Sequence, residues 1–139
     1  MLNSLFCTLA KAMAFAGLVL VSAAPSAQVF DPYSGQETYM RFCAACHGES
    51  ARGDGPVSSA LPVQVPDLTL LQQRRGDRFP EEILRKIIDG QEPVIVHGTR
   101  YMPVWGYEFW VEEGADDEAK ERVEMIVDNL VEYLRSLQQ

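Results

Sequence analysis

Apolar side chains recur three or four positions apart near the end of the chain. This spacing predicts a helix from about residue 116 to residue 138 with one apolar face. Acidic residues open the segment, which suits the positive end of a helix dipole. The predicted apolar face consists of Val123, Ile126, Val127, Leu130, Leu134 and Leu137.

Two shorter helices are predicted earlier in the chain. One runs from about residue 35 to 45, because Ser34 and Glu37 have the form of a capping box at its start. The other begins at Pro80 and ends before Gly90, since proline suits the first helical position and glycine the end. The pattern therefore predicts an all-α domain with three main helices joined by loops.

The first 27 residues have the character of an export signal. Lys11 is the only charged residue there, and the apolar run from Ala12 to Ala24 is too short to cross a bilayer comfortably. We predict a signal peptide at residues 1–27 and one domain at residues 28–139 that acts in the periplasm. An uncleaved membrane anchor is the alternative. After removal of the signal, the domain is expected not to span a membrane.

The candidate chemistry lies in Cys43-Ala44-Ala45-Cys46-His47. C-x-x-C-H is the attachment signature for a covalent c-type haem. Thiols three positions apart can form thioethers with the two vinyl groups on one edge of a haem. His47 would then lie under the ring as the proximal iron ligand. We predict one haem c bound by Cys43, Cys46 and His47, with the Nδ1–H of His47 donating to a loop carbonyl, for which Pro56 is the first candidate.

The two cysteines allow three other interpretations. A zinc site would use Cys43, Cys46 and His47, with His97 as a fourth ligand. A thioredoxin-like redox pair would require a preceding strand, whereas a helical pattern precedes this motif. A disulfide across two intervening residues would be strained. Haem attachment is favoured over all three.

Electron transfer requires a sixth iron ligand, and Met102 is the candidate. Met102 lies in a predicted loop, and Pro103 restricts its backbone to an extended form that would present the sulfur. Met40 is on the same short predicted helix as the haem motif, and Met125 lies in the charged half of the last helix. His97 is the competing ligand, and an ordinary core role for Met102 also remains open. A methionine and histidine pair would raise the reduction potential relative to two histidines.

The chain is acidic, with 12 Lys and Arg against 20 Asp and Glu and a formal net charge of −8. This balance argues against nucleic acid as a partner, because phosphate binding requires clustered basic residues. It favours redox protein partners that present a basic docking face. An acidic surface without a docking role is the alternative.

In these motifs and their order, the chain resembles the class I cytochromes c, the monohaem family. C-A-A-C-H-G, G-D-G-P, P-D-L-T, M-P-V-W-G and L-V-E-Y-L-R-S-L follow one another between residues 34 and 137. The resemblance implies that residues 28–139 form a cytochrome c domain whose first and last helices cross near Gly35, Tyr39 and Tyr133. It also implies thioethers at Cys43 and Cys46, iron ligation by His47 and Met102, and electron transfer as the activity.

One segment departs from this pattern. Residues 106–114 look longer than usual, and their aromatic residues Tyr107, Phe109 and Trp110 would either cover the haem or form a docking surface. The sequence thus predicts an electron carrier rather than an enzyme, either a soluble shuttle or the cytochrome subunit of an oxidoreductase complex. The alternative is a ligand-binding or catalytic haem protein with a labile sixth ligand.

Overall fold

The computed structural model describes residues 31, 33–90 and 101–139. These residues form α-helices and short 3₁₀ helices, with no strand among them, so the predicted all-α class is confirmed. The expected signal peptide and His97 lie outside the described residues. The elements in chain order are α1 (Gly35–Phe42), α2 (Ala44–His47), η1 (Ser58–Ala60), η2 (Leu68–Leu70), η3 (Gln73–Arg75), α3 (Glu81–Asp89), α4 (Trp105–Glu112) and α5 (Asp117–Ser136).

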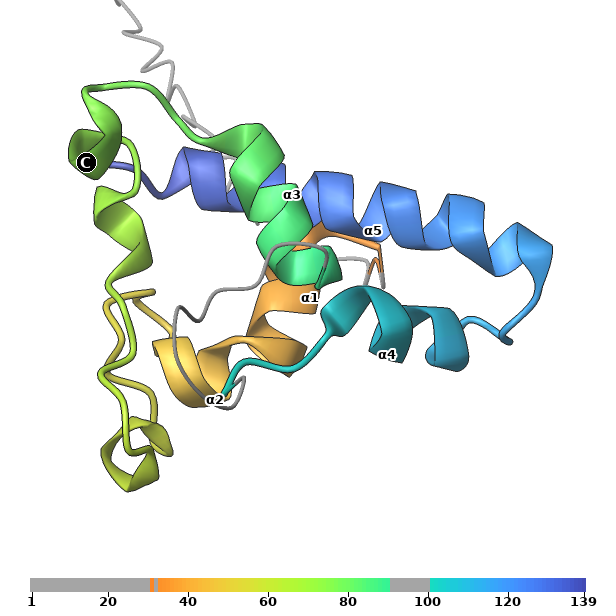
Figure 1. Cartoon of the computed structure of the whole chain (residues 1–139), viewed down its shortest axis with the longest axis horizontal. Helices are drawn as coiled ribbons and strands as arrows, with labels where there is room; N and C mark the ends of the chain where they lie inside the picture. Colours follow the sequence, from red (N-terminus) through yellow and green to blue (C-terminus); the bar gives the residue numbers. More distant parts are fainter. Residues whose placement is uncertain (1–30, 32, 91–100) are drawn as a thin grey trace, which may run out of the picture.

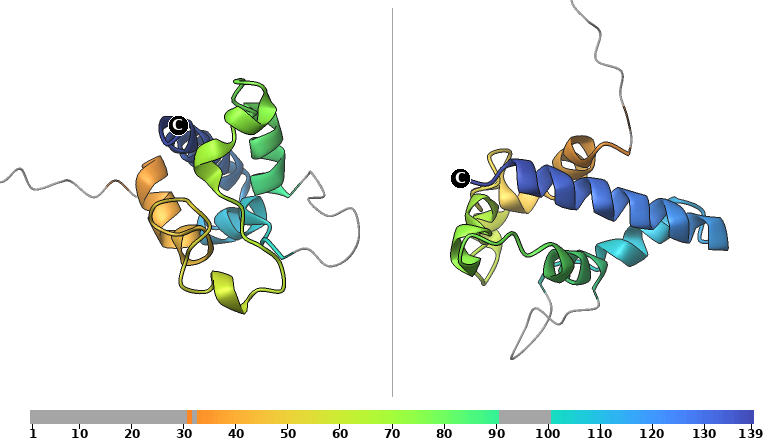
Figure 2. Two further views of the ribbon diagram at one scale, coloured as in Figure 1. Left: turned by 90° about the vertical axis from the view of Figure 1, so that its left-hand side faces the viewer. Right: turned by 90° about the horizontal axis from the view of Figure 1, so that it is seen from above.

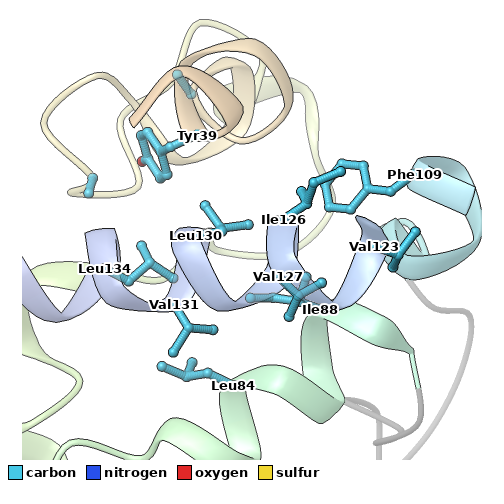
Figure 3. Close-up of a cluster of buried hydrophobic side chains, with 12 residues drawn as sticks. Tyr39, Leu84, Ile88, Phe109, Val123, Ile126, Val127, Leu130, Val131 and Leu134 are labelled. Carbon is cyan, nitrogen blue, oxygen red and sulfur yellow. The ribbon is translucent and has the colours of Figure 1, made fainter. Parts of the chain in front are cut away.

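Helix α5 is the long element on which the other helices pack (Figure 1). It begins after Asp116, whose side chain accepts a hydrogen bond from the backbone N–H of Ala119 at 2.6 Å. Helices α1, α3 and α4 surround one face of α5, with α1 and α3 on its two flanks (Figure 2). Leu84 of α3, Tyr39 of α1 and Phe109 of α4 therefore meet the same apolar stripe of α5 (Figure 3). Buried residues of that stripe are Val123, Ile126, Val127, Leu130, Val131 and Leu134.

The predicted crossing of the first and last helices is present at Gly35. A Cβ atom on Gly35 would lie 2.6 Å from the carbonyl carbon of Asn129 and 2.8 Å from Cβ of Tyr133, both of α5. One turn later, the rings of Tyr39 and Tyr133 lie with their centroids 5.4 Å apart. Only glycine permits this approach of the two backbones, so Gly35 fixes how α1 sits on α5.

The ends of the predicted helices are close to those observed. The Ser34 hydroxyl accepts from the backbone N–H of Glu37 at 3.1 Å, as the capping box predicts, but the N–H of Ser34 donates to the carbonyl of Asp31 at 2.9 Å and not to the Glu37 side chain. Helix α1 stops at Phe42 rather than continuing to residue 45, because a turn at Cys43 separates it from α2. Pro80 precedes the first residue of α3 instead of occupying it, and Gly90 ends that helix with a φ of 87°.

Helix α4 was not predicted, so the expectation of three main helices was too low. Its sequence, Trp-Gly-Tyr-Glu-Phe-Trp-Val-Glu, is rich in side chains that lose rotamer freedom in a helix, and only Glu108 and Glu112 are polar on its exposed face. Tertiary packing stabilises it instead. Phe109 is 2 % exposed, and the centroid of its ring lies 5.1 Å from that of Phe42 of α1 and 5.9 Å from that of Trp105. Within the described part of the chain, no helix is both long and apolar enough to cross a membrane.

Candidate functional site

A single helical turn carries the cysteine and histidine motif. Cys43 joins α1 to α2, and its carbonyl oxygen accepts from the backbone N–H groups of Cys46 at 3.1 Å and His47 at 2.8 Å. These bonds hold the two thiols and the imidazole on one compact turn. All three side chains are partly buried, because α2 packs against α1 on one side and the following loop on the other.

The chain leaves α2 through Gly48 in a conformation that suits glycine. Gly48 has a φ of 81°, and a Cβ atom there would collide with the carboxylate of Asp54. The loop then folds back onto α2. The N–H of Gly53 donates to the carbonyl of His47 at 2.8 Å, and that of Gly55 donates to the carbonyl of Cys46 at 3.2 Å. The predicted Gly-Asp-Gly-Pro turn therefore serves to satisfy the carbonyl groups at the end of α2.

The imidazole of His47 is oriented by Pro66 and not by Pro56, which corrects the prediction. Nδ1 of His47 lies 3.4 Å from the carbonyl oxygen of Pro66. Pro66 reaches this place because the N–H of Leu68 donates to the carbonyl of Ala51 at 2.7 Å, which draws the later loop over α2. Since a carbonyl can only accept, this contact places the proton on Nδ1 and leaves Nε2 as the nitrogen with a free lone pair.

Burial favours the neutral form of the same imidazole. It holds the pKa of His47 below its ordinary value, although the hydrogen bond to Pro66 opposes the shift. A neutral imidazole with Nε2 unprotonated is the form that ligates a metal. The local environment of His47 therefore suits an iron ligand.

The two thiols are free, and their environment is unlike that of a redox pair. Burial, with a further contribution from Cys46, raises the pKa of the Cys43 thiol to about 12. A thioredoxin-like nucleophile has the opposite shift, because the thiolate must form near neutral pH. Among the described residues, no group of three or more His, Cys, Asp and Glu side chains is arranged to hold a metal ion. Neither the thiol-redox nor the zinc interpretation gains support from these residues.

Met102 differs from the other methionines that the structure describes. Met40 on α1 is 41 % exposed and Met125 on α5 is 47 % exposed. Met102 is partly buried just ahead of α4 and packs against the same apolar cluster as Cys43. Of the three described methionines, Met102 is therefore the one whose side chain packs against the core.

The residues around the motif fit a haem. Two thiols and an imidazole on one turn, together with a partly buried methionine, are donors of the kinds that a covalent haem with two iron ligands needs. Cys43 and Met102 belong to a set of partly buried side chains that pack against the hydrophobic core, which also includes the apolar residues Phe42, Leu68, Leu71, Phe79 and Trp105. A cavity of about 540 Å³ between α3, α4 and α5 is lined by none of the four donor residues and is therefore a separate feature.

Comparison with known families decides the relationship that these features suggest. A family model described as "Cytochrome C oxidase, cbb3-type, subunit III" matches residues 31–120, more than half of the chain. The chain belongs to this family. A comparison with curated proteins and one with solved structures each found no match.

Membership in the cbb3-type subunit III family confirms the resemblance to monohaem c-type cytochromes. The family consists of electron carriers, and it implies a covalently bound haem c with its iron. The matched range includes the whole of α1 and α2, the loop with Pro66, and Met102.

Sequence reasoning did not identify Tyr39 as part of this site. Its hydroxyl donates to the carbonyl oxygen of Gly48 at 2.7 Å, in a fully buried position. Burial raises the pKa of Tyr39, so its hydroxyl remains a donor across the ordinary pH range. The only signal in the sequence was the shared helical face of Tyr39 and Cys43, which indicates proximity to the motif but not this bond.

Proposed function

We propose that the protein carries single electrons in the periplasm through one haem c. In this proposal Cys43 and Cys46 hold the haem through thioethers, and His47 and Met102 are the axial ligands. The observation that carries the proposal is the α2 turn, which presents both thiols beside a neutral imidazole whose Nδ1 lies 3.4 Å from the Pro66 carbonyl. When bound, the haem supplies a reversible one-electron change at its iron.

Each part of the chain has a distinct task in this proposal. The thioethers fix the position of the cofactor, so that electron transfer needs no binding or release. The Pro66 carbonyl fixes the plane and tautomer of His47 and raises its basicity as a ligand. Met102 closes the sixth position, which keeps small molecules from the iron. The rings of Phe42, Trp105 and Phe109 form an aromatic cluster at the start of the motif, because Phe42 directly precedes Cys43.

Several features support export and a protein partner. The apolar first segment supports a signal peptide at residues 1–27, and haem c of this family is typically attached outside the cytoplasm. The net charge of −8 supports partners with a basic docking face. The family description names an oxidase subunit, which favours the subunit form of the proposal over the free shuttle. Co-purification with a larger oxidoreductase would support the subunit form, and a free monomer would contradict it.

Replacement of Met102 tests the proposed sixth ligand. We expect Met102→Ala to convert the low-spin haem to a high-spin form that binds carbon monoxide, because no other thioether in the described residues is held at the core. The measurement is the visible spectrum of the reduced protein with and without carbon monoxide. Met125→Ala is the matched control, since Met125 is exposed on α5, and it should keep the parent spectrum.

A Met102→Ala protein that stays low-spin and does not bind carbon monoxide would contradict the assignment of Met102 as the sixth iron ligand. The sixth ligand would then be another residue, with His97 the first candidate. A parent protein that itself binds carbon monoxide rapidly would indicate a ligand-binding or catalytic haem protein instead of an electron carrier.

A further inference from the structure

Tyr39 occupies a position where a phenylalanine would pack equally well. Its side chain is 0 % exposed, and its ring lies against that of Tyr133 at the α1–α5 crossing. A buried hydroxyl is costly unless it is hydrogen-bonded, so the bond that it makes is the feature that distinguishes tyrosine here. That bond runs to the carbonyl oxygen of Gly48, the residue directly after His47, at 2.7 Å.

The Gly48 carbonyl is the first member of a hydrogen-bonded path that ends on the imidazole. The same oxygen accepts from the N–H of Ala51 at 3.1 Å. The carbonyl of Ala51 accepts from the N–H of Leu68 at 2.7 Å. Two residues before Leu68, the carbonyl of Pro66 faces Nδ1 of His47 at 3.4 Å. The hydroxyl of Tyr39 thus anchors both the residue that follows the ligand and the loop that orients it.

We propose that Tyr39 is a positioning residue for His47. Its hydroxyl ties the exit of α2 to the α1–α5 crossing, so that the packing of these two helices sets the orientation of the imidazole. The inference rests on the proposed function, because the orientation of His47 affects the iron only if His47 is an iron ligand. Groups that hold a metal ligand from behind tune the metal as well as the ligand geometry.

The test compares Tyr39→Phe with Tyr133→Phe. Each variant removes one hydroxyl from the same pair of rings, but only Tyr39 bonds to Gly48. We expect Tyr39→Phe to keep its covalent haem and its low-spin state. The ratio of folded to unfolded protein should fall about fivefold, because this factor corresponds to the net free energy that one neutral hydrogen bond contributes to stability. Its ferric electron paramagnetic resonance g-values and its reduction potential should both shift. Tyr133→Phe should leave the g-values and the potential at those of the parent.

Unchanged g-values and an unchanged potential in Tyr39→Phe would overturn the inference and leave Tyr39 a packing residue. If Tyr39→Phe yields no folded protein, Tyr39→4-methylphenylalanine decides, because its methyl group fills the place of the hydroxyl but cannot donate a hydrogen bond. Shifted g-values in that variant would support the inference, and parent-like values would contradict it. A failure of the proposed function is distinguishable from either result, since the parent itself would then carry no covalent haem.

Discussion

Replacing both Cys43 and Cys46 with alanine is expected to abolish covalent haem attachment. The two thiols are free and lie on one turn beside His47, and no other cysteine is present in the described residues. Without thioethers, haem would be held only by its axial ligands and by apolar contacts. We therefore expect the double variant to lose all haem staining on a denaturing gel, where the parent retains it.

The single variants Cys43→Ala and Cys46→Ala serve as controls for this loss. Each keeps one thiol on the turn, so each should retain some covalent haem. Its reduced absorption band should move to longer wavelength, because one vinyl group of the haem would remain unreacted. Covalent haem that persists in the double variant would contradict attachment at this motif. Loss of the folded protein in all three variants would instead show that the thioethers are required for folding.

Gly35→Ala is expected to destabilise the protein by about 2 to 3 kcal/mol, because the new methyl group would collide with α5. Its Cβ would lie 2.6 Å from the carbonyl carbon of Asn129 and 2.8 Å from Cβ of Tyr133, so the helices would have to separate. This outcome is the reverse of the usual one, since alanine in place of glycine normally favours a helix by about 1 kcal/mol. The midpoint of urea unfolding of the haem-bound protein measures the difference.

Gln36→Ala is the matched control for Gly35→Ala. Gln36 is the next residue of α1 and is exposed, so its replacement should change the free energy of unfolding by less than about 0.5 kcal/mol. An unfolding midpoint for Gly35→Ala equal to or above that of the parent would contradict the close crossing of α1 and α5.

Local signals in the sequence were enough to predict the two helices that cross. The stripe from Val123 to Leu134 and the Ser34 cap both depend on neighbours a few residues away, and both are present in the structure. The crossing at Gly35 came from the family resemblance, and the geometry at that residue explains it. Features set by near neighbours, or shared through the family, were therefore predictable.

Features that depend on distant contacts were not predictable from the sequence. Helix α4 is stabilised by the packing of Phe109 on α1, because most of its own residues are poor helix formers. The choice of Pro66 over Pro56 depends on the bond between Leu68 and Ala51, which no local pattern encodes. The Tyr39 hydroxyl bond likewise requires the exit of α2 to turn back toward α1.

The aromatic residues after Met102 have different environments, which the sequence could not separate. Phe109 is buried in the core, Trp110 is partly buried, and Tyr107 is 59 % exposed. All three lie on one short helix, α4, and the choice between covering the haem and forming a docking surface stays a prediction. Of the three, Tyr107 alone has the exposure that a docking role requires.

The visible spectrum of the protein, matured with a cytochrome c assembly system, tests the central claim most directly. It would be recorded air-oxidised and then dithionite-reduced, with and without carbon monoxide. We predict sharp reduced bands, a weak far-red band from methionine-ligated ferric haem, and no response to carbon monoxide. A colourless protein would contradict the claim that the α2 turn holds a haem, and a rapid carbon monoxide shift would contradict its role as a six-coordinate electron carrier.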